Sequence, residues 1–507
     1  MKDQVTIYYT SDVHGYLFPT SYGDTQEKPM GLLNCISQFQ KDGNTLIFDG
    51  GDTLQGSPMA SYIEAKGAEL SEADPFALVY NTAGYDAVVP GNHDFNFGYD
   101  RLSRYFNALS GQCLCANAKD LGGKTNLKKS HIFTLENGLR IGVAGIVTDY
   151  VNVWEQPEHL KQIQITDAFQ AAKEELSALK KECDVTICIY HGGYECDLNT
   201  GEVLSTSSEN AGYRILKELD YDLLLTAHQH MPVAGREISG THTLQLIPNA
   251  VQYAKVQITV ENGNVFIESA ICPAGNFHEK EPYKSLLFLE EKVQKWLDVS
   301  IGQLQTPIPE KDKLSMAMYG SGVADLFNQI QLAYSGADIS CVGLGNTPMS
   351  LPAHVTMRDL VRVYPFSNTL VVLSLDEEIL KRALERCAQY FTIKNDGAVE
   401  ISDVFLNPKI EHYNYDYFAG ITYEIDLHKP VGSRVRRILF KGKPLDGRRL
   451  TLCMSDYRAS GTGGYEGYKT CEIVTRISRE VPELALEYLK KHPIVEVRQN
   501  GGIVFCQ

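Results

Sequence analysis

The feature that most constrains this chain is a series of short apolar runs, each followed by a small polar cluster. The runs have the length and the β-branched content of buried strands, and they cover residues 5–9, 46–48, 87–89, 185–190 and 223–225. The clusters that follow them are Asp12-Val13-His14, Gly50-Gly51-Asp52, Gly91-Asn92-His93-Asp94, His191-Gly192-Gly193 and His228-Gln229-His230. Because α/β sheets place their sites at the carboxyl ends of strands, we expect these clusters to meet in one crevice.

The side chains in these clusters indicate a metal site. Carboxylate, amide and imidazole groups together suit Mn²⁺, Zn²⁺ or Fe²⁺ better than Ca²⁺. Asp52 follows two glycines whose backbone can approach another loop closely, which suits a ligand that bridges two ions. Each motif alone has a plainer interpretation: Asp-x-His and His-x-His pairs are weak signals, Asn92 is typical of a turn, and His191 could simply satisfy its hydrogen bonds at a strand end. All the clusters in order at strand ends favour a two-metal hydrolase.

Composition limits the partners of the chain. Its 507 residues, 43% of them hydrophobic, can form two to three domains, and no segment approaches the roughly 18 apolar residues that span a bilayer. The net charge of −16 argues against a nucleic-acid polymer or an anionic membrane as partner, although bound divalent cations still allow phosphate to bind. We expect a small-molecule substrate and a monomer or weak oligomer.

The amino end and the cysteines indicate an intracellular enzyme. Residues 1–4 lead straight into the first apolar run, without the charged and apolar regions of a signal peptide, so we expect a cytoplasmic protein. The 12 cysteines are scattered, and several lie inside apolar runs. That pattern predicts buried thiols, not a disulfide framework.

Residues 5 to about 275 alternate strand-like runs with helical stretches at 31–41, 75–83 and 165–182. The alternation predicts βαβ units. Asn137-Gly138 and Asn262-Gly263 each lie between alternating apolar residues and predict two hairpins. This part of the chain is therefore expected to form a sandwich of sheets flanked by helices.

The chain changes character after residue 278. Ser285–Leu297 has apolar residues at helical spacing, and Gly302 and two prolines then interrupt the pattern. We therefore predict a first domain over 1–278, a linker helix within 279–305 and a second domain over 306–507. The second domain again mixes strands and helices, with a hairpin at Lys441-Gly442.

Taken together, the polar clusters resemble those of the calcineurin-like metallophosphoesterases. The resemblance implies an α/β (α+β) protein whose first domain is a four-layer α/β/β/α sandwich with two divalent metal ions, of Mn, Zn, Fe, Co or Mg. By that resemblance, one ion would be held by Asp12, His14, Asp52 and His230, and the other by Asp52, Asn92, His191 and His228. His93 would not ligate; it would face the phosphate, stabilise its developing charge and protonate the leaving oxygen.

Further segments carry a narrower resemblance to the bacterial 5′-nucleotidase and 2′,3′-cyclic-nucleotide 2′-phosphodiesterase family. The matching segments cover residues 52–58, 81–82, 91–98, 364–370, 413–416, 420–426 and 455–461. The resemblance spans nearly the full length, and it implies that residues 306–507 form a smaller α+β domain of the 5′-nucleotidase C-terminal type, which grips the nucleoside.

Aromatic side chains in the second domain fit that task, because a base stacks favourably on a tyrosine ring. We expect Tyr413 and Tyr457 to hold the base, with Tyr415 as the alternate to Tyr413 and Asn414 as a neighbouring substrate contact. The other interpretation of these tyrosines is that they pack on a sheet, where tyrosine is common.

Two departures from the family pattern bear on the substrate. The 5′-nucleotidase branch usually carries Asp where this chain has Asn96. We place Asn96 beside His93 as a catalytic residue. Asn stabilises a positive charge on His93 less well than Asp does. Asn at this position resembles the cyclic-phosphodiesterase branch. A Gly-Gly-Arg signature of many members is also missing, since residues 344–352 contain no arginine and the first one after them is Arg358.

The sequence therefore predicts hydrolysis of nucleotide phosphoesters by metal-bound hydroxide, with 5′- or 3′-mononucleotides, 2′,3′-cyclic nucleotides, or both as substrates. One alternative is hydrolysis of nucleotide-sugars or other pyrophosphates, which the missing arginine disfavours. Another is a catalytically idle nucleotide-binding protein, which the full set of metal ligands disfavours.

Overall fold

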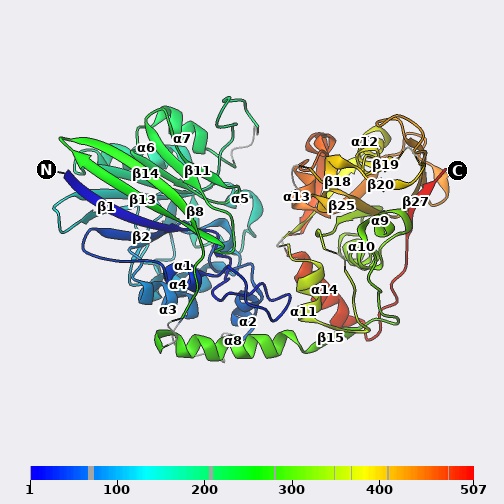
Figure 1. The fold of residues 1–507 in the computed structure, drawn as a ribbon, viewed down its shortest axis with the longest axis horizontal. Helices are drawn as coiled ribbons and strands as arrows, with labels where there is room; N and C mark the ends of the chain where they lie inside the picture. The colour runs from blue at the N-terminus through cyan, green and yellow to red at the C-terminus, as the bar shows by residue number, and fades with distance from the viewer. Residues whose placement is uncertain are drawn as a thin grey trace. The chain divides into compact units, whose positions relative to one another are not determined.

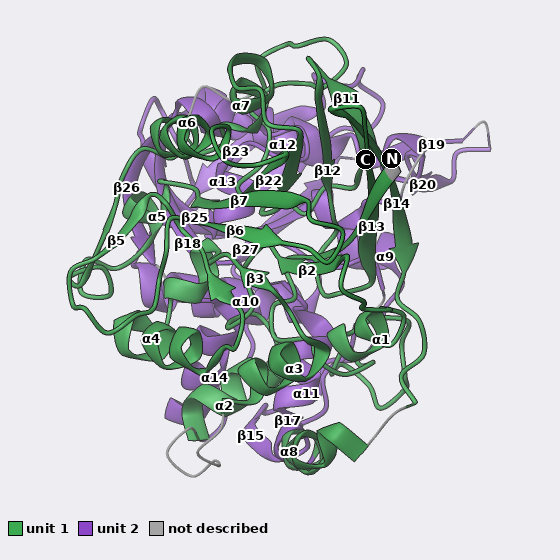
Figure 2. Cartoon of the chain, turned by 90° about the vertical axis from the view of Figure 1, so that its left-hand side faces the viewer, with its two compact units in different colours: residues 1–294 green, residues 295–507 purple. Residues whose placement is uncertain are grey.

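The structure is a computed structural model. It describes residues 2–66, 74–204, 209–278, 281–347, 349–366, 368–394, 396–407, 410–477 and 479–506. Pro348 and Ser367, which belong to two of the segments compared above, and residues 279–280 of the predicted linker lie outside the described residues. The chain divides into two compact units, residues 1–294 and 295–507 (Figure 2). The division falls inside helix α8 (Lys284–Leu297), the helix expected within the linker.

The first unit contains two six-stranded sheets (Figure 1). The first sheet has the strand order β14 (Asn264–Pro273), β13 (Gln252–Glu261), β1 (Lys2–Thr10), β2 (Thr45–Asp49), β3 (Ala87–Val88) and β4 (Gln112–Cys113). The second has the order β11 (Val233–Ile238), β12 (Thr241–Gln245), β10 (Leu223–Thr226), β9 (Val185–His191), β7 (Arg140–Val147) and β6 (Ser130–Thr134). A separate pair is formed by β5 (Ala118–Asp120) and β8 (Ile163–Ile165).

Parallel strands occupy the centre of each sheet; antiparallel pairs form one edge of the first sheet and both edges of the second. Strands β1 to β4 pair in parallel, as do β7, β9, β10 and β12. Both predicted hairpins are present: β6 pairs with β7 across Asn137-Gly138, and β13 pairs with β14 across Asn262-Gly263. All five apolar runs predicted as strands are strands, so their carboxyl ends lie at one edge of each sheet.

The main core of this unit lies between the two sheets. Val5, Ile7 and Tyr9 alternate along β1 and pack in one cluster with Ile141 and Ile187 of the second sheet. On the outer face of the second sheet, apolar side chains of α6 and α7 form a second cluster with β9 and β10. Figure 1 shows α3 and α4 on the opposite side of the unit. The predicted four-layer α/β/β/α sandwich is confirmed.

The helices of the first unit are mostly short. They are α1 (Leu32–Ile36), α2 (Pro58–Lys66), α3 (Pro75–Ala83), α4 (Gly98–Ala108), α5 (Val151–Trp154), α6 (Ala168–Leu179) and α7 (Gly212–Glu218), with a 3₁₀ turn at Asn92–Phe95. Asp74 caps α3 and Asp167 caps α6, each accepting backbone N–H bonds of the first turn. Helix α1 is shorter than the predicted stretch 31–41, because Phe39 leaves the helix to stack on Tyr8 with ring centroids 4.4 Å apart.

The second unit is built on a five-stranded and a four-stranded sheet. The first has the order β21 (Asp416–Ala419), β16 (Ile339–Gly343), β25 (Leu450–Ser455), β18 (Leu370–Leu375) and β26 (Glu472–Ile477). The second has the order β24 (Lys443–Pro444), β23 (Val435–Phe440), β22 (Ile421–Ile425) and β27 (Gly501–Phe505), and includes the hairpin predicted at Lys441-Gly442. Two-stranded pairs are β15 (Ser300–Gln303) with β17 (His354–Thr356) and β19 (Phe391–Ile393) with β20 (Val399–Ile401).

The helices that accompany these sheets are α9 (Lys313–Tyr319), α10 (Gly322–Ser335), α11 (Met357–Val363), α12 (Glu377–Ala388), α13 (Asp456–Ala459) and α14 (Val481–Lys491). Among the described residues, no helix is both long and apolar enough to cross a bilayer. All 12 cysteines are described, and each is a free thiol; eight of them are buried, as the sequence predicted, and four are partly exposed.

Candidate metal centre

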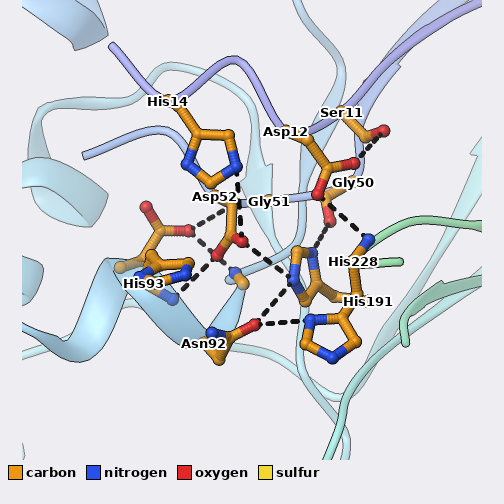
Figure 3. A network of polar contacts seen from close by, with 12 residues as sticks. Ser11, Asp12, His14, Gly50, Gly51, Asp52, Asn92, His93, His191 and His228 are labelled. Atoms are coloured by element: carbon orange, nitrogen blue, oxygen red, sulfur yellow. Dashed lines mark hydrogen bonds and ion pairs between the residues drawn. The ribbon is translucent and has the colours of Figure 1, made fainter. Parts of the chain in front are cut away.

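The polar clusters of the first unit meet at the carboxyl ends of β1, β2, β3, β9 and β10 (Figure 3). Two groups of candidate metal ligands form there, each with its ligand atoms within 4.8 Å of one another. One group is Asp12, His14, Asp52 and His230, and the other is Asp52, His191 and His228. Asp52 belongs to both groups, which is the arrangement expected of a carboxylate that bridges two ions.

Asn92 joins the second group through its amide oxygen. Asn92 Oδ1 lies 3.1 Å from His191 Nε2 and 2.9 Å from His228 Nδ1. All seven side chains predicted as metal ligands are thus brought together from the ends of five separate strands.

The backbone of these loops is unusual. Asp12, His14, Asp52, His228 and His230 all have positive φ, between 50° and 75°. Only a few per cent of residues other than glycine adopt this left-handed region, and each costs of order 1–3 kcal/mol unless its surroundings impose it. The strain lies in five of the seven predicted ligands, so the fold stabilises the ligand geometry at the expense of local backbone energy.

Close packing between two loops imposes this conformation at Asp52. Gly51 has φ +95°, and a Cβ built there would lie 2.3 Å from the backbone nitrogen of Gly91. Asp94 joins the same two loops, because its carboxylate accepts N–H bonds of 2.8–2.9 Å from Asp52, Thr53, Leu54 and Gly91. The glycine pair and the last residue of the Gly91–Asp94 cluster therefore position the ligands without ligating.

Backbone carbonyls fix the orientation of two histidines. His14 Nδ1 donates to the Gln55 carbonyl at 2.9 Å, and His191 Nδ1 donates to the Gly50 carbonyl at 2.7 Å. Nε2 is therefore the nitrogen that each ring presents to the site. Metal-ligating histidines are typically held in this way by an outer hydrogen bond.

The donor atoms fit a divalent cation. Asp52 Oδ2 is buried and accepts no hydrogen bond from the described residues, although His191 Nε2 lies 3.3 Å away. The Nε2 atoms of His14 and His230 lie only 3.0 Å apart. An orphaned carboxylate oxygen and facing imidazole nitrogens, all converging on one point, are best satisfied by cations.

Electrostatics keeps the carboxylates ionised. Burial alone would raise the pKa of Asp12, but the hydrogen bond and charge of His230 lower it to about 2. Burial likewise opposes ionisation of Asp52, yet the charges of His191 and His93 hold its pKa well below the usual range. Both acids are therefore available as anionic ligands at neutral pH.

The buried histidines differ in their pKa. Burial lowers the pKa of His14 to about 4, which makes it a neutral ligand at neutral pH. Burial also disfavours charge on His191, but Asp52 overcomes this and raises the pKa of His191 to about 9. A cation between Asp52 and His191 therefore competes with a proton, and its affinity falls as the pH falls.

His93 lies beside the predicted ligands and is held on two sides. Its backbone N–H donates to Asp52 Oδ1 at 2.8 Å, and its ring stands 5.5 Å from the ring of His14. Its Nδ1 lies 2.8 Å from Asn96 Oδ1 and 2.9 Å from Gln55 Oε1. The structure thus brings both residues predicted as catalytic, His93 and Asn96, to the edge of the metal centre.

Two carboxylates near the site were not found from the sequence. Glu209 Oε1 lies 3.1 Å from His228 Nε2, which leaves His228 Nδ1 facing Asn92. Glu155 Oε2 accepts from Asn96 Nδ2 at 2.8 Å. Neither residue follows a strand or belongs to a recognisable motif, so only the folded structure identifies them.

In the second unit, two of the predicted tyrosines line one cavity. Its volume is about 270 Å³, and its wall includes Tyr413, Tyr457, Tyr364, Phe366 and Gln331. Tyr457 is 41% exposed, so its ring can take a partner without repacking of the core. Four of the residues in this wall are aromatic, as expected for a site that stacks a flat ring.

A buried ion pair joins the two tyrosine segments. Arg458 pairs with Asp416 at 2.8 Å and donates to the backbone carbonyl of Tyr413, also at 2.8 Å. Burial opposes the charge of Arg458, but Asp416 raises its pKa above the ordinary value. Because Arg458 follows Tyr457 in the chain, these contacts join the two backbone segments that carry the rings.

The structure places the two other predicted substrate contacts outside the cavity wall. Tyr415 is buried at 2% exposure in the main core of this unit, and its hydroxyl donates to the Ala317 carbonyl. Asn414 is also buried, and its side chain is held by Glu411 and Arg458. Neither residue is among those that line the cavity, because each is engaged in packing and hydrogen bonds behind its wall.

Comparison with known proteins gives two family matches. Residues 5–232 match the calcineurin-like phosphoesterase model, and residues 300–470 match the 5′-nucleotidase C-terminal domain model. A solved structure of a Staphylococcus aureus protein assigned as a 5′-nucleotidase, in complex with alpha-ketoglutarate, is 30% identical. It covers 99% of this chain and 100% of its own length, with a TM-score of 0.78.

Characterised relatives are more distant in sequence. The trifunctional nucleotide phosphoesterase protein YfkN of Bacillus subtilis is 24% identical over 98% of this chain, and this chain spans only 38% of its length. A 2′,3′-cyclic-nucleotide 2′-phosphodiesterase/3′-nucleotidase of Yersinia enterocolitica is 24% identical, over 90% of this chain and 80% of the relative.

Proposed function

We propose a reaction for this chain, which belongs to the calcineurin-like phosphoesterases that carry a 5′-nucleotidase C-terminal domain. Several relatives are named as nucleotide phosphoesterases or nucleotidases, and the chain is a metal-dependent hydrolase of nucleotide phosphoesters. We propose that this chain hydrolyses 2′,3′-cyclic nucleotides and 3′-mononucleotides, with Mn²⁺, Zn²⁺ or Fe²⁺ as the bound cations.

The observation that carries the proposal is the position of Asp52. Its carboxylate belongs to both groups of candidate ligands, and its buried Oδ2 accepts no hydrogen bond from the described part of the chain. When bound, a pair of divalent cations supplies a nucleophile at neutral pH and neutralises charge on the phosphoryl group. Asp12, His14, Asp52 and His230 would hold one cation, and Asp52, Asn92, His191 and His228 the other.

His93 is suited to the leaving group. With Nδ1 turned to Asn96 and Gln55, Nε2 on the opposite edge of the ring is the nitrogen that meets the substrate. From there it can stabilise charge on the phosphoryl oxygens and give a proton to the departing oxygen. Positioned acids of this kind contribute roughly 10²- to 10⁴-fold to a reaction rate.

Asn96 supports the choice of a cyclic substrate, because Asn at this position resembles the cyclic-phosphodiesterase branch. The relative from Yersinia enterocolitica, named for both a 2′-phosphodiesterase and a 3′-nucleotidase activity, supports the same choice. The aromatic cavity with Tyr413 and Tyr457 supports a substrate that carries a base. The cytoplasmic location expected from the sequence stays a prediction.

A second candidate is the hydrolysis of 5′-mononucleotides. The Staphylococcus aureus protein assigned as a 5′-nucleotidase favours it, because that protein is 30% identical and the match covers nearly the whole of both proteins. The two candidates share the metal centre and differ only in the phosphate that reaches it.

One experiment separates these activities. Chelator-stripped protein is titrated with Mn²⁺, and 2′,3′-cAMP, 3′-AMP and 5′-AMP are assayed in parallel. We expect turnover that depends on metal and is fastest with the cyclic or 3′-substrate. Faster turnover of 5′-AMP would transfer the assignment to the second candidate, and no turnover of any nucleotide with metal present would refute both.

A further inference from the structure

A chain of hydrogen bonds connects His93 to a buried carboxylate outside the metal centre. His93 Nδ1 lies 2.8 Å from Asn96 Oδ1, and Asn96 Nδ2 donates to Glu155 Oε2, also at 2.8 Å. The other oxygen of Glu155 lies 2.8 Å from His159 Nδ1 and accepts from the Gln156 backbone N–H at 2.7 Å. The Glu155 side chain is 3% exposed, and the residue follows helix α5 directly.

The chemistry of these groups allows the chain of hydrogen bonds only one donor-to-acceptor direction. An ionised carboxylate only accepts hydrogen bonds, so Glu155 requires the NH₂ of Asn96 to face it. The Asn96 carbonyl must then face His93, and it can only accept. The proton between them therefore sits on His93 Nδ1, which also faces the Gln55 side-chain oxygen at 2.9 Å.

We propose that Glu155 is a positioning residue for His93. By holding the Asn96 amide in one orientation, it places a proton on His93 Nδ1 and so leaves Nε2 as the nitrogen that serves the substrate. This inference rests on the proposed role of His93 at the leaving group. It also gives a physical account of Asn96: the 5′-nucleotidase branch usually has a carboxylate at this position, and in this protein a carboxylate lies one hydrogen bond further from His93.

Two single substitutions disturb this chain of hydrogen bonds in opposite ways. Asn96→Asp sets a second carboxylate against Glu155 at hydrogen-bond distance, where two anions repel each other. In Glu155→Gln, the Gln156 N–H holds the new amide oxygen, so its NH₂ faces Asn96. The Asn96 amide must then rotate and present NH₂ to His93, which is the wrong polarity.

The double substitution restores the pattern. With both changes, the glutamine NH₂ donates to the aspartate, and the aspartate accepts from His93 Nδ1. We therefore expect each single variant to lose about 10- to 100-fold in kcat, the range typical of outer-shell partners. The double variant should recover at least about tenfold over either single variant, with KM and metal content close to those of the wild type.

A matched control uses a nearby exposed residue. Glu158 lies three residues from Glu155 and its side chain is 68% exposed. Glu158→Gln alone should leave kcat unchanged, and combined with Asn96→Asp it should give no recovery. Bis(p-nitrophenyl) phosphate serves as a second substrate, because its leaving group needs little proton donation. Asn96→Asp and Glu155→Gln should each lose far less on this ester than on the nucleotide.

Three results would overturn the inference. They are a wild-type kcat in both single variants, a kcat of the double variant no higher than that of the less active single variant, or equal losses of kcat on both substrates. If the variants do not fold, imidazole ¹⁵N shifts of His93 in the wild-type protein decide instead: neutral His93 should carry its proton on Nδ1, and a proton on Nε2 would contradict the proposal. A wild-type protein without nucleotide turnover would refute the proposed function, whereas an active wild type with unaffected variants would refute only the role of Glu155.

Discussion

Replacing Tyr457 by alanine should weaken nucleotide binding while leaving the phosphate chemistry intact. The ring of Tyr457 lines the aromatic cavity of the second unit and is 41% exposed. A base that stacks on such a ring gains about 1–3 kcal/mol, as judged by alanine substitution. Since about 1.4 kcal/mol is a factor of ten in an equilibrium constant, the variant should raise KM for the preferred nucleotide by roughly 5- to 150-fold.

The assay compares two substrates and two tyrosines. Steady-state KM and kcat are measured with the nucleotide and with p-nitrophenyl phosphate, which has no base to stack. Tyr319 is the matched control, because it lies in the same unit, is 69% exposed and is not part of the cavity wall. Tyr457→Phe should retain the wild-type KM, since stacking uses the ring and not the hydroxyl.

An unchanged KM for the nucleotide in Tyr457→Ala would contradict a base-stacking role of Tyr457. An equal loss on p-nitrophenyl phosphate, or a similar loss in Tyr319→Ala, would contradict it as well. In each case the cavity would not be where the base is held.

Two further predictions concern the metal centre and the stability of the second unit. Glu209 Oε1 lies 3.1 Å from His228 Nε2, so Glu209→Gln should reduce metal affinity or activity by about 10- to 100-fold. The affinity is measured by titrating Mn²⁺ into stripped protein. An affinity equal to that of the wild type would exclude a role of Glu209 in supporting His228. Burial lowers the pKa of Lys313 from 10.5 to about 8, so between these pH values the unfolded chain binds more protons than the folded one and stability rises with pH. Lys313→Met should therefore have a larger unfolding free energy than the wild type. In denaturant titrations this difference should be largest below pH 8 and should shrink toward pH 10.5; a pH-independent difference would contradict this.

The sequence predicted the strands and the clustering of the candidate metal ligands, because both depend on local pattern. An apolar run followed by Asp, Asn or His specifies a buried strand and a polar loop at its end, and parallel pairing then brings the loops together. Asp12, Asp52 and His191 accordingly lie where their positions after β1, β2 and β9 placed them. Helix α1 was predicted too long because Phe39 stacks on Tyr8, a contact that no local pattern shows.

The tyrosines of the second unit could be predicted only in part. Tyr413 lines the cavity, whereas Tyr415, two residues later, is buried in the core. Residues two apart on a strand share one face, so alternation would treat them alike. The 3₁₀ turn His412–Asn414 precedes strand β21 and breaks that alternation between the two rings.

The carboxylates around the site could not be predicted from the sequence. Glu155 is 59 residues away from Asn96, and Glu209 is 19 residues before His228. Their contacts follow from the packing of α5 and of the segment before α7, and neither residue has a fixed spacing from a ligand. Outer hydrogen-bond partners of this kind are set by tertiary structure.

The central claim is that Asp52 lies between two bound metal ions. Anomalous diffraction at the manganese edge, from crystals of stripped protein reloaded with Mn²⁺, tests it most directly. We expect two ions about 3.5–4 Å apart, with Asp52 in contact with both, His14 and His230 on one, and His191 and His228 on the other. A single ion at this site, or two ions that Asp52 does not bridge, would contradict it.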